Sequence, residues 1–550
     1  MLQELLKQQF ITTVLRPVNY NEQLGHRSFS VLVVDKAALE VISSCMSLNE
    51  VFEEGVTLVE DLTKNREPMP SMPAIYIMLP TIESIDILIN DFTIKSRLQP
   101  SNAYKEAHVF FLEPVDDNIM LKVAKSPAFR FIKSFKEIDA NFKAIESQIF
   151  TTHSHAQGKM AKIADGIVGL CVTLKINPLL RYHSNFPQSS EICYRVDERL
   201  KAFDNNGMRS DAELIVLERS FDLVSPLLHE MTLQAMASDL TDFQNGVYKY
   251  TINHEEKKEI AMDENDSIWI DIRHKHLSAV MSTVPQLTKE LGQIERSDQA
   301  RTAKEVQSKI RQLPAHLKKK GKIAAYINLV EECRDNYFKS LENIILLEQD
   351  MAVGHTSDGD KLTDSQAVSR LSTFIGPAIP TETRLRLILI FMLTIGKDKD
   401  DQFFNHLLRH TDIAESEFTI IKNMLNWRNT TPASHPRRPL SQEERFASSR
   451  WEPNISSLVQ EIQEKRLDER EFKVLGNKST SVSRPAQSAR YGSGLAGRPR
   501  EKRKIIIFII GGITFSEIRT AYEMSKKLNT TIILGSDSIL TPSKFLKTLR

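Results

Sequence analysis

The residues whose types and positions could do chemistry lie at the ends of apolar runs. Asp35 follows VLVV, and Asp222 ends a run that begins at residue 213. Open α/β enzymes hold functional acids at such strand ends. A glycine pair follows the run at 505–510, but IIGGITF matches neither GxGxxG nor the Gly-Lys-Ser/Thr of a Walker motif. Each acid can equally be a strand-end cap, and the glycines indicate a tight strand-to-helix turn.

Metal and nucleophile chemistry have no complete pattern in this chain. The His-x-His pairs at 153–155 and 274–276 lack a third ligand at helical or ribbon spacing. The sequence also lacks a GxSxG elbow, an HExxH helix and a catalytic cysteine signature. We therefore expect a binding scaffold with no catalytic residue, no cofactor and no metal. An α/β enzyme that uses a nucleotide stays open as the alternative.

Length and composition exclude several classes of protein. The chain has 550 residues, of which 41% are hydrophobic, and its 72 basic and 71 acidic residues give a net charge of +1. This composition indicates several globular domains and argues against wholesale disorder and against a dedicated nucleic-acid binder. Four separated cysteines indicate a reducing compartment. The longest apolar runs have strand length, so we expect a soluble chain without a signal peptide.

The first part of the chain alternates between strand and helix patterns. Continuous apolar strands separated by helices predict an open parallel sheet that is covered on both faces. The expected strands are 31–35, 55–61, 74–80, 107–113 and 129–135, and the expected helices are 37–46 and 81–92.

A second α/β region is expected around a buried strand at 213–222. Residues 159–204 and 227–240 have mostly helical patterns, and the pattern stops near VYKY at 247–250. A strand, helix and strand at 505–512, 515–528 and 531–536 are too few for a stable sheet alone, so they should join the sheet that contains the 213–222 strand.

The region between these two pieces, 268–475, is predicted to be nearly all helix, with a kink or a break at Pro314. The basic, Ser- and Gly-rich stretch 476–504 lacks apolar periodicity and predicts a disordered linker.

These patterns predict a mixed α/β and α fold. Two α/β domains have parallel-type sheets, the second of them is discontinuous, and a mainly helical third domain is inserted into it. The predicted bounds are 1–138 for domain 1, 139–251 plus 505–550 for domain 2, 252–475 for domain 3 with a helical hairpin near 285–350, and 476–504 for the linker.

Five segments together resemble the SM (Sec/Munc) family of syntaxin-binding proteins, and most closely its exocytic Munc/Unc branch. They are REPMPSMPAIYIMLP at 66–80, ERSFDLVSPLLHEMTLQAM at 218–236, DSIWIDIRHKH at 266–276, SRWEP at 449–453 and IIIFIIGGITFSEIRTAYE at 505–523. The resemblance covers almost the whole chain. It implies a three-domain arch without catalytic activity, in which a cleft holds a syntaxin-type SNARE.

The resemblance assigns residues to two contact regions of domain 1. In the cleft, Asp35 and Glu60 match acidic family positions, and Ile42 and Ser44 are expected on the same face. Glu40 and Ser47 stand where neuronal members carry basic residues, which implies a different charge preference for the partner. The expected pocket for the N-terminal peptide of syntaxin is lined by Met120, Ala124, Ile132, Phe135 and Glu137.

A third region lies in the helical domain. Pro314 matches the family's hinge proline, and Ile323 and Ile327 would form an apolar stripe for a vesicle SNARE helix. For the peptide pocket of domain 1, a purely structural role of Ile132 and Phe135 as core residues stays open.

The function implied by the resemblance is to chaperone SNARE assembly for vesicle docking and fusion in exocytosis. The expected partners are a syntaxin-type SNARE, the assembled SNARE complex and a vesicle SNARE, bound by a monomer or in a 1:1 complex. The expected location is cytoplasmic, with syntaxin recruiting the chain to the plasma membrane. The alternative within the family is a Golgi, endosomal or vacuolar step.

Overall fold

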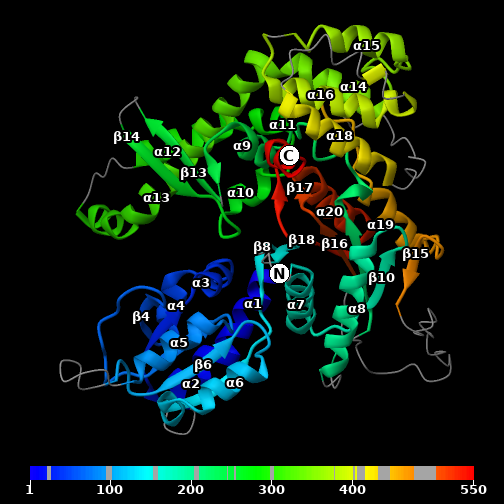
Figure 1. The fold of residues 1–550 in the computed structure, drawn as a ribbon. Helices are drawn as coiled ribbons and strands as arrows, with labels where there is room; N and C mark the ends of the chain where they lie inside the picture. The colour runs from blue at the N-terminus through cyan, green and yellow to red at the C-terminus, as the bar shows by residue number, and fades with distance from the viewer. Residues whose placement is uncertain are drawn as a thin grey trace, which may run out of the picture. The chain divides into compact units, whose positions relative to one another are not determined.

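A computed structural model gives the fold of the chain (Figure 1). The structure describes residues 1–21, 26–93, 102–152, 159–203, 208, 210–244, 246–252, 256–297, 303–376, 378–399, 403–404, 415–430, 446–475 and 503–550. The chain forms two compact units, and each is described by itself. The first unit comprises Met1–Glu218, Glu461–Gly512 and Ala521–Ser538, and the second comprises Arg219–Gln460, Ile513–Thr520 and Ile539–Arg550. The partition into three domains stays a prediction.

The first unit begins with a parallel five-stranded sheet whose strand order is β4-β3-β5-β6-β7. All five strands were predicted from the sequence. Their bounds are β3 Ser30–Val34, β4 Val56–Asp61, β5 Ala74–Met78, β6 Ala107–Phe111 and β7 Ile132–Glu137. The helices between them are α3 Lys36–Ser43, α4 Leu48–Glu53, α5 Ile82–Asp91, α6 Asp117–Ala124 and the 3₁₀ segment η2 Pro127–Phe131.

Side chains alternate between the two faces of this sheet, as strand geometry requires. Leu32 and Val34 pack on one face in a core shared with α3. Val31 and Val33 pack on the other face, in a core that includes residues of α5 and α6. Both faces are therefore covered by helices, which explains why the strands read as continuous apolar runs.

The second sheet of this unit has seven strands in the order β15-β10-β11-β16-β18-β9-β8. Strand β11 pairs in parallel with β16, which confirms that the C-terminal strand joins the sheet of the 213–222 run. Strand β10 was missed, because the helical patterns around it hid a short strand. The strands are β8 Phe142–Glu146, β9 Ile149–Thr152, β10 Leu179–His183, β11 Ala212–Glu218, β15 Phe472–Val474, β16 Lys504–Ile510 and β18 Thr531–Ser536.

Helices complete the first unit. The N-terminal helical segment, residues 2–19, packs against β8 and helix α7, so one core reaches both sheets. The remaining helices are α1 Leu2–Phe10, the π-helix η1 Ile11–Leu15, α2 Arg16–Asn19, α7 Lys159–Leu174 and α8 Pro187–Ala202, besides a two-stranded ribbon of β1 Tyr20–Asn21 and β2 His26–Arg27. Helix α20 (Phe515–Leu528) contributes residues to both units, and Thr514 caps it, since the Glu517 N–H donates to Thr514 Oγ1 (3.2 Å).

The second unit is mainly helical, as predicted (Figure 1). Its helices are α9 Leu233–Leu240, α10 Ser267–Ile272, α11 Leu277–Met281, α12 Val284–Ser297, α13 Ala303–Asn336, the π-helix η4 Tyr337–Leu341, α14 Glu342–Val353, α15 Asp364–Ser372, α16 Thr381–Leu393, the 3₁₀ helix η5 Ile395–Asp398, α18 Glu415–Thr430 and α21 Pro542–Thr548; α19 Ile455–Glu464 spans the unit boundary. Its strands are β12 Phe243–Gln244, β13 Val247–Ile252 and β14 Glu256–Ala261 in one sheet, and β17 Ile513–Thr514 with β19 Ile539–Leu540.

Three sequence expectations for this unit are corrected. The hairpin of β13 and β14 was missed, because alternation in KYT and EKKEIA is masked by charge. Residues 227–232 are not helical, since the loop that follows Asp222 is fixed by hydrogen bonds from the Val224 and Ser225 N–H groups to Asp222 Oδ1. Helix α13 runs through Pro314 without ending, so a break there is wrong, while a bend stays a prediction. The linker prediction for 476–504 falls almost entirely outside the described residues.

Candidate partner-binding groove

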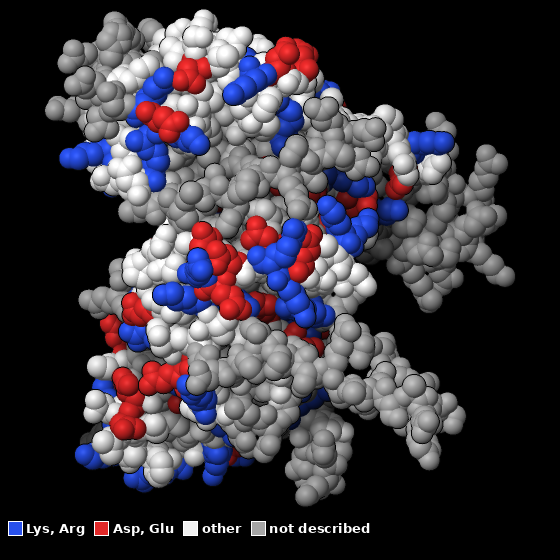
Figure 2. Space-filling model, turned by 90° about the vertical axis from the view of Figure 1, so that its right-hand side faces the viewer, with Lys and Arg blue, Asp and Glu red and all other residues white. Residues whose placement is uncertain are grey.

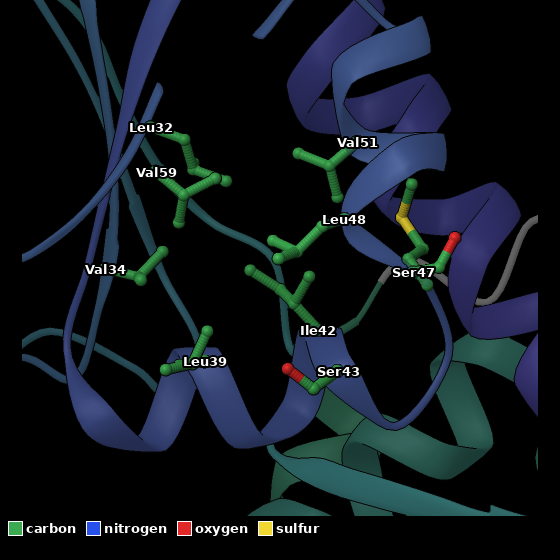
Figure 3. A pocket seen from close by; sticks show the side chains of 10 residues that line it. Leu32, Val34, Leu39, Ile42, Ser43, Ser47, Leu48, Val51 and Val59 are labelled. Atoms are coloured by element: carbon green, nitrogen blue, oxygen red, sulfur yellow. The ribbon is translucent and has the colours of Figure 1, made fainter. Parts of the chain in front are cut away.

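An apolar groove lies at the edge of the five-stranded sheet, beside β4. It has a cavity volume of about 260 Å³. Figure 3 shows Ile42, Leu48 and Val51 pointing toward the strand residues Val34 and Val59 across the hollow. We call this feature the groove. Its lining residues are Leu32, Val34, Leu39, Ile42, Ser43, Met46, Ser47, Leu48, Val51 and Val59.

Two capped helices form one wall of the groove. Asp35 is the N-cap of α3, and its Oδ1 accepts the Ala38 N–H at 2.8 Å. Ser47 is the N-cap of α4 in a reciprocal capping box with Glu50, so each side chain accepts a backbone N–H of the other. Such boxes satisfy two helix-end donors at once. The sequence therefore fixes where both helices begin, and with them the position of the wall.

The rim of the groove exposes large apolar side chains. Leu48 and Phe52 of α4 are 57% and 44% exposed, and Leu39 of α3 is 41% exposed. Leu48 and Phe52 are four residues apart and therefore share a helix face. Apolar residues gathered around a hollow are typical of a surface that receives another protein. The sequence analysis named none of these three, although the i, i+4 spacing of Leu48 and Phe52 was a usable signal.

Charge beside the groove is largely neutralised within the protein. Glu40 Oε2 lies 3.2 Å from Lys143 Nζ of β8, so its charge is compensated. Ser47, the other departure from the neuronal pattern, has a structural reason in the capping box of α4. With Glu40 paired and Ser47 bonded within α4, the groove presents mainly apolar surface. Figure 2 draws another face of the molecule, on which basic and acidic side chains are interspersed.

The predicted cleft residues fall into separate environments. Asp35 is buried, and its second oxygen Oδ2 accepts the Leu79 N–H at 2.7 Å. Burial raises the pKa of Asp35, against the lowering effect of these N–H groups. In the structure, Asp35 links the end of β3, which it follows, to the end of β5, which Leu79 follows. Ser44 is half-buried and its Oγ accepts the Ala144 N–H (3.1 Å).

Ile42 and Glu60 lie on opposite faces of the sheet, so the expectation of one shared face is wrong. Glu60 pairs in register with Val33, whereas Ile42 belongs to the core that contains Val34. Glu60 accepts a hydrogen bond from the Tyr104 hydroxyl on its own face. The one-residue register shift between Ser30 and Val31 decides which β4 residues face which core, and it was not visible in the sequence.

Unlike the predicted cleft residues, the strand residues that were predicted for the peptide pocket share one face of the sheet. A bulge in β7 brings Ile132, Phe135 and Glu137 opposite Ala107, Val109 and Phe111, which share one face of β6. Without the bulge, Ile132 and Phe135 would point to opposite faces. Helix α6 packs on this face, with Met120 and Ala124 on its exposed side.

The side chains of this second site have visible partners. Phe135 is half-buried and packs edge to face against Phe111 at 4.9 Å between ring centroids. Glu137 is exposed, and its Oε1 accepts the Val115 N–H at 2.8 Å. The carboxylate of Glu137 is therefore accessible, which fits the predicted slot with one carboxylate.

The predicted stripe in the helical unit is not a surface here. Ile323 is 0% exposed and packs in the core with Trp269 and Tyr326. Ile327 is partly buried against the same core, and the Pro314 side chain lies outside the described ones. Binding of a vesicle SNARE through these residues stays a prediction.

The described residues give no support to a metal site, a membrane span or a catalytic role of Asp222. They contain no group of three or more His, Cys, Asp or Glu side chains that could hold a metal ion. In the same part of the chain, every helix is too short or too polar to span a bilayer. Asp222, the second strand-end acid, has both oxygens bonded: Oδ2 accepts the Ser225 hydroxyl (2.7 Å) and the Asn454 N–H (3.0 Å).

Comparison with known proteins identifies the family. Residues 30–548 match the model of the Sec1 family. The chain is 29% identical over 606 residues to "Protein transport protein sec1" of Dictyostelium discoideum, covering 100% of this chain and 98% of the relative. It is 24% identical to "SNARE-interacting protein KEULE" of Arabidopsis thaliana, over 95% of this chain and 92% of that one.

Solved structures agree with this match. The Unc18 structure from the Unc18–syntaxin 1 complex of Monosiga brevicollis has a TM-score of 0.85 and 25% identity, covering 100% of this chain and 98% of that chain. The SM protein Vps45, solved in complex with the Qa SNARE Tlg2, shares the fold with a TM-score of 0.81 at 19% identity, covering 99% and 97%. The resemblance drawn from the sequence is confirmed: this chain belongs to the Sec1 family of SM proteins.

Proposed function

We propose that this chain binds a syntaxin-type SNARE and acts in SNARE-mediated vesicle traffic. One observation carries the proposal: over its whole length the chain is similar in fold and sequence to an Unc18 solved as a complex with syntaxin 1. The relative named as a SNARE-interacting protein supports the same partner. The protein acts by binding rather than by catalysis, with no cofactor.

The groove is the seat that we propose for a SNARE helix. An amphipathic helix recognises its partner by laying apolar residues at i, i+3 and i+4 into a hydrophobic groove. Leu39, Leu48 and Phe52 offer exposed apolar area on a wall that Asp35 and Ser47 preorganise. The slot between α6 and β7 is a second, separate site, for the N-terminal peptide of the SNARE.

Exocytosis is the step that we propose, with recruitment to the plasma membrane by syntaxin. Among the relatives from Dictyostelium discoideum, the Sec1 protein is 29% identical to this chain and Vps45 is 22% identical. A Golgi, endosomal or vacuolar step stays the alternative within the family.

Calorimetric titration of the full chain with cytoplasmic fragments of syntaxin tests this function. We expect a dissociation constant between nanomolar and micromolar for an exocytic syntaxin, and weaker binding of an endosomal one. A fragment that lacks its N-terminal peptide should bind less tightly if the slot between α6 and β7 contributes. Binding of the endosomal fragment alone would move the protein to the other trafficking step, and binding of neither would refute the function.

A further inference from the structure

Helix α4, which carries the exposed rim of the groove, has little packing of its own. Val51 is the buried residue among its six. A helix this short is not stable by itself, so contacts with the rest of the protein must hold it in place. The position of the wall therefore depends on the groups that tie α4 down.

Charged contacts tie both ends of α4 to the N-terminal helical segment. At the first turn, Lys7 Nζ donates to Glu50 Oε1, while Glu50 Oε2 accepts the Ser47 N–H at 2.8 Å. At the last turn, the Arg16 guanidinium forms two hydrogen bonds of 3.0 Å with the Glu54 carboxylate. The Asn19 amide adds a bond of 3.1 Å to the Glu54 carbonyl.

The N-terminal segment is itself anchored in the core. Leu6 and Phe10 are buried in the core that reaches both sheets. The Gln9 amide donates to the Ile138 carbonyl at 2.8 Å and its oxygen accepts the Thr173 hydroxyl at 2.6 Å. The ion pairs therefore connect α4, which has little packing of its own, to an N-terminal segment that is anchored in the core.

We propose that Lys7 and Glu50, backed by Arg16 and Glu54, form an ionic latch that holds α4 at its distance from β4 and so sets the width of the groove. Lys7 and Glu50 are positioning residues, and neither has to touch the partner. This inference rests on the proposed function in one respect, namely that the groove is where the SNARE binds.

The electrostatics of the pair are consistent with a latch. The hydrogen bond from Lys7 lowers the pKa of Glu50 to about 2, and the same bond raises the pKa of Lys7. Both groups therefore stay charged over the physiological range. Their side chains are 22% and 37% exposed, so salt reaches the pair and weakens it.

Two variants and one control test the latch in the full chain. Lys7→Met removes the charge and keeps an apolar stem, and Lys7→Arg restores a cation. Lys201→Met breaks a surface pair with Asp197 on α8, away from the groove, and serves as the matched control.

Amide exchange of the free protein comes first, since it needs no partner. Lys7→Met should speed exchange of the α4 amides several-fold, while Lys7→Arg and Lys201→Met leave it near the wild-type rate. Unchanged exchange of α4 in Lys7→Met would overturn the latch, whatever the protein binds.

Affinity for the exocytic syntaxin fragment then separates positioning from plain stability. Lys7→Met should weaken binding by about threefold to tenfold, because preorganisation is lost, and Lys7→Arg should recover most of it. The deficit should shrink in 0.5 M salt, which already screens the wild-type pair. If Lys7→Met lowers the melting temperature and leaves the affinity unchanged, the ion pair contributes to stability alone and does not position the groove, which would overturn the proposal. Failure of the wild type to bind would instead refute the proposed function, and the exchange result would still decide the latch.

Discussion

Two short segments of the first unit are held by ion pairs, namely the connector between β7 and β8 and the helix α4 of the groove wall. The two segments differ in how far they are exposed to solvent. Residues 138–141 of the connector are mostly buried, and Asp139 holds a left-handed backbone with a φ of 43°. Arg199 lies 3.4 Å from Asp139 and 3.5 Å from Asp165. Around α4, by contrast, the ion pairs lie at the surface and apolar side chains face solvent.

Glycine packing sharpens the contrast. Gly166 and Gly169 of α7 lie directly against the connector, because a Cβ at Gly169 would be 2.8 Å from the Asp139 carbonyl oxygen. The approach beside α4 is less tight, since a Cβ at Gly55, just after the helix, would lie 3.0 Å from the Ser28 carbonyl oxygen. The difference teaches that this unit fixes the joint between its two sheets by close packing, while it leaves the recognition surface adjustable. A binding protein needs both properties, since a partner must enter the groove without loosening the scaffold.

The largest expected effect breaks the joint. A Cβ at Gly166 would lie 2.5 Å from Thr152 Cγ2 and 2.8 Å from the Asn141 carbonyl oxygen. Gly166→Ala should therefore lower stability by about 1–3 kcal/mol, although alanine normally favours a helix. Calorimetric melting measures this loss. Gly321→Ala in α13, where a Cβ meets nothing within 4 Å, is the control and should stabilise by about 0.5–1 kcal/mol. Equal melting temperatures of Gly166→Ala and wild type would contradict the close-packed joint.

The pH dependence of the joint comes next. Burial raises the pKa of Asp139 to about 6, against the attraction of Arg199 and with repulsion from Glu137 and Asp165. A pKa raised on folding means that ionising Asp139 costs stability. Its contribution is full below about pH 4 and is lost as the pH rises through 6. Relative to Asp139→Asn, the wild type should lose about 1–2 kcal/mol between pH 4.5 and 7.5. Parallel melting curves of the two proteins across that range would disprove this.

An acidic group on the groove wall should weaken binding and spare the fold. Leu48→Glu places a charge on a side chain that is already 57% exposed, so melting should be unchanged. Affinity for the exocytic syntaxin fragment should fall about tenfold, or ~1.4 kcal/mol, because the apolar seat is lost. Tyr194→Glu on α8, at a side chain that is 58% exposed, is the control. Equal affinities of the two variants would move the binding site away from the groove.

The smallest effect concerns the charge beside the groove. Lys143→Met removes the cation that lies 3.2 Å from Glu40. Exposed pairs contribute little, so affinity should change by less than about threefold in the same titration. A larger change would mean that Glu40 meets a charge on the partner, as its departure from the neuronal pattern suggested.

The sequence predicted the scaffold better than the site. Continuous apolar runs such as VLVV and IIIFII identified the buried strands, and the match of distant segments identified the family. Register was not predictable, because a single shift beside Ser30 sends Glu60 to the face opposite Ile42. The bulge in β7 is the same kind of feature, although there it brings the predicted residues together.

Exposure was the other property that the sequence could not supply. Ile323 and Ile327 have the spacing of a partner stripe, yet Ile323 is buried in the core of its unit. Leu48 and Phe52 have the same spacing and face solvent. Only the packing of neighbouring elements distinguishes the two pairs.

Amide exchange of the full chain with and without the exocytic syntaxin fragment tests the central claim most directly, since it reports both regions in one experiment. The account predicts slower exchange in α3, α4 and β4, and unchanged exchange at residues 138–141. Protection confined to other elements, with α4 exchanging as in the free protein, would contradict the groove as the seat of the SNARE.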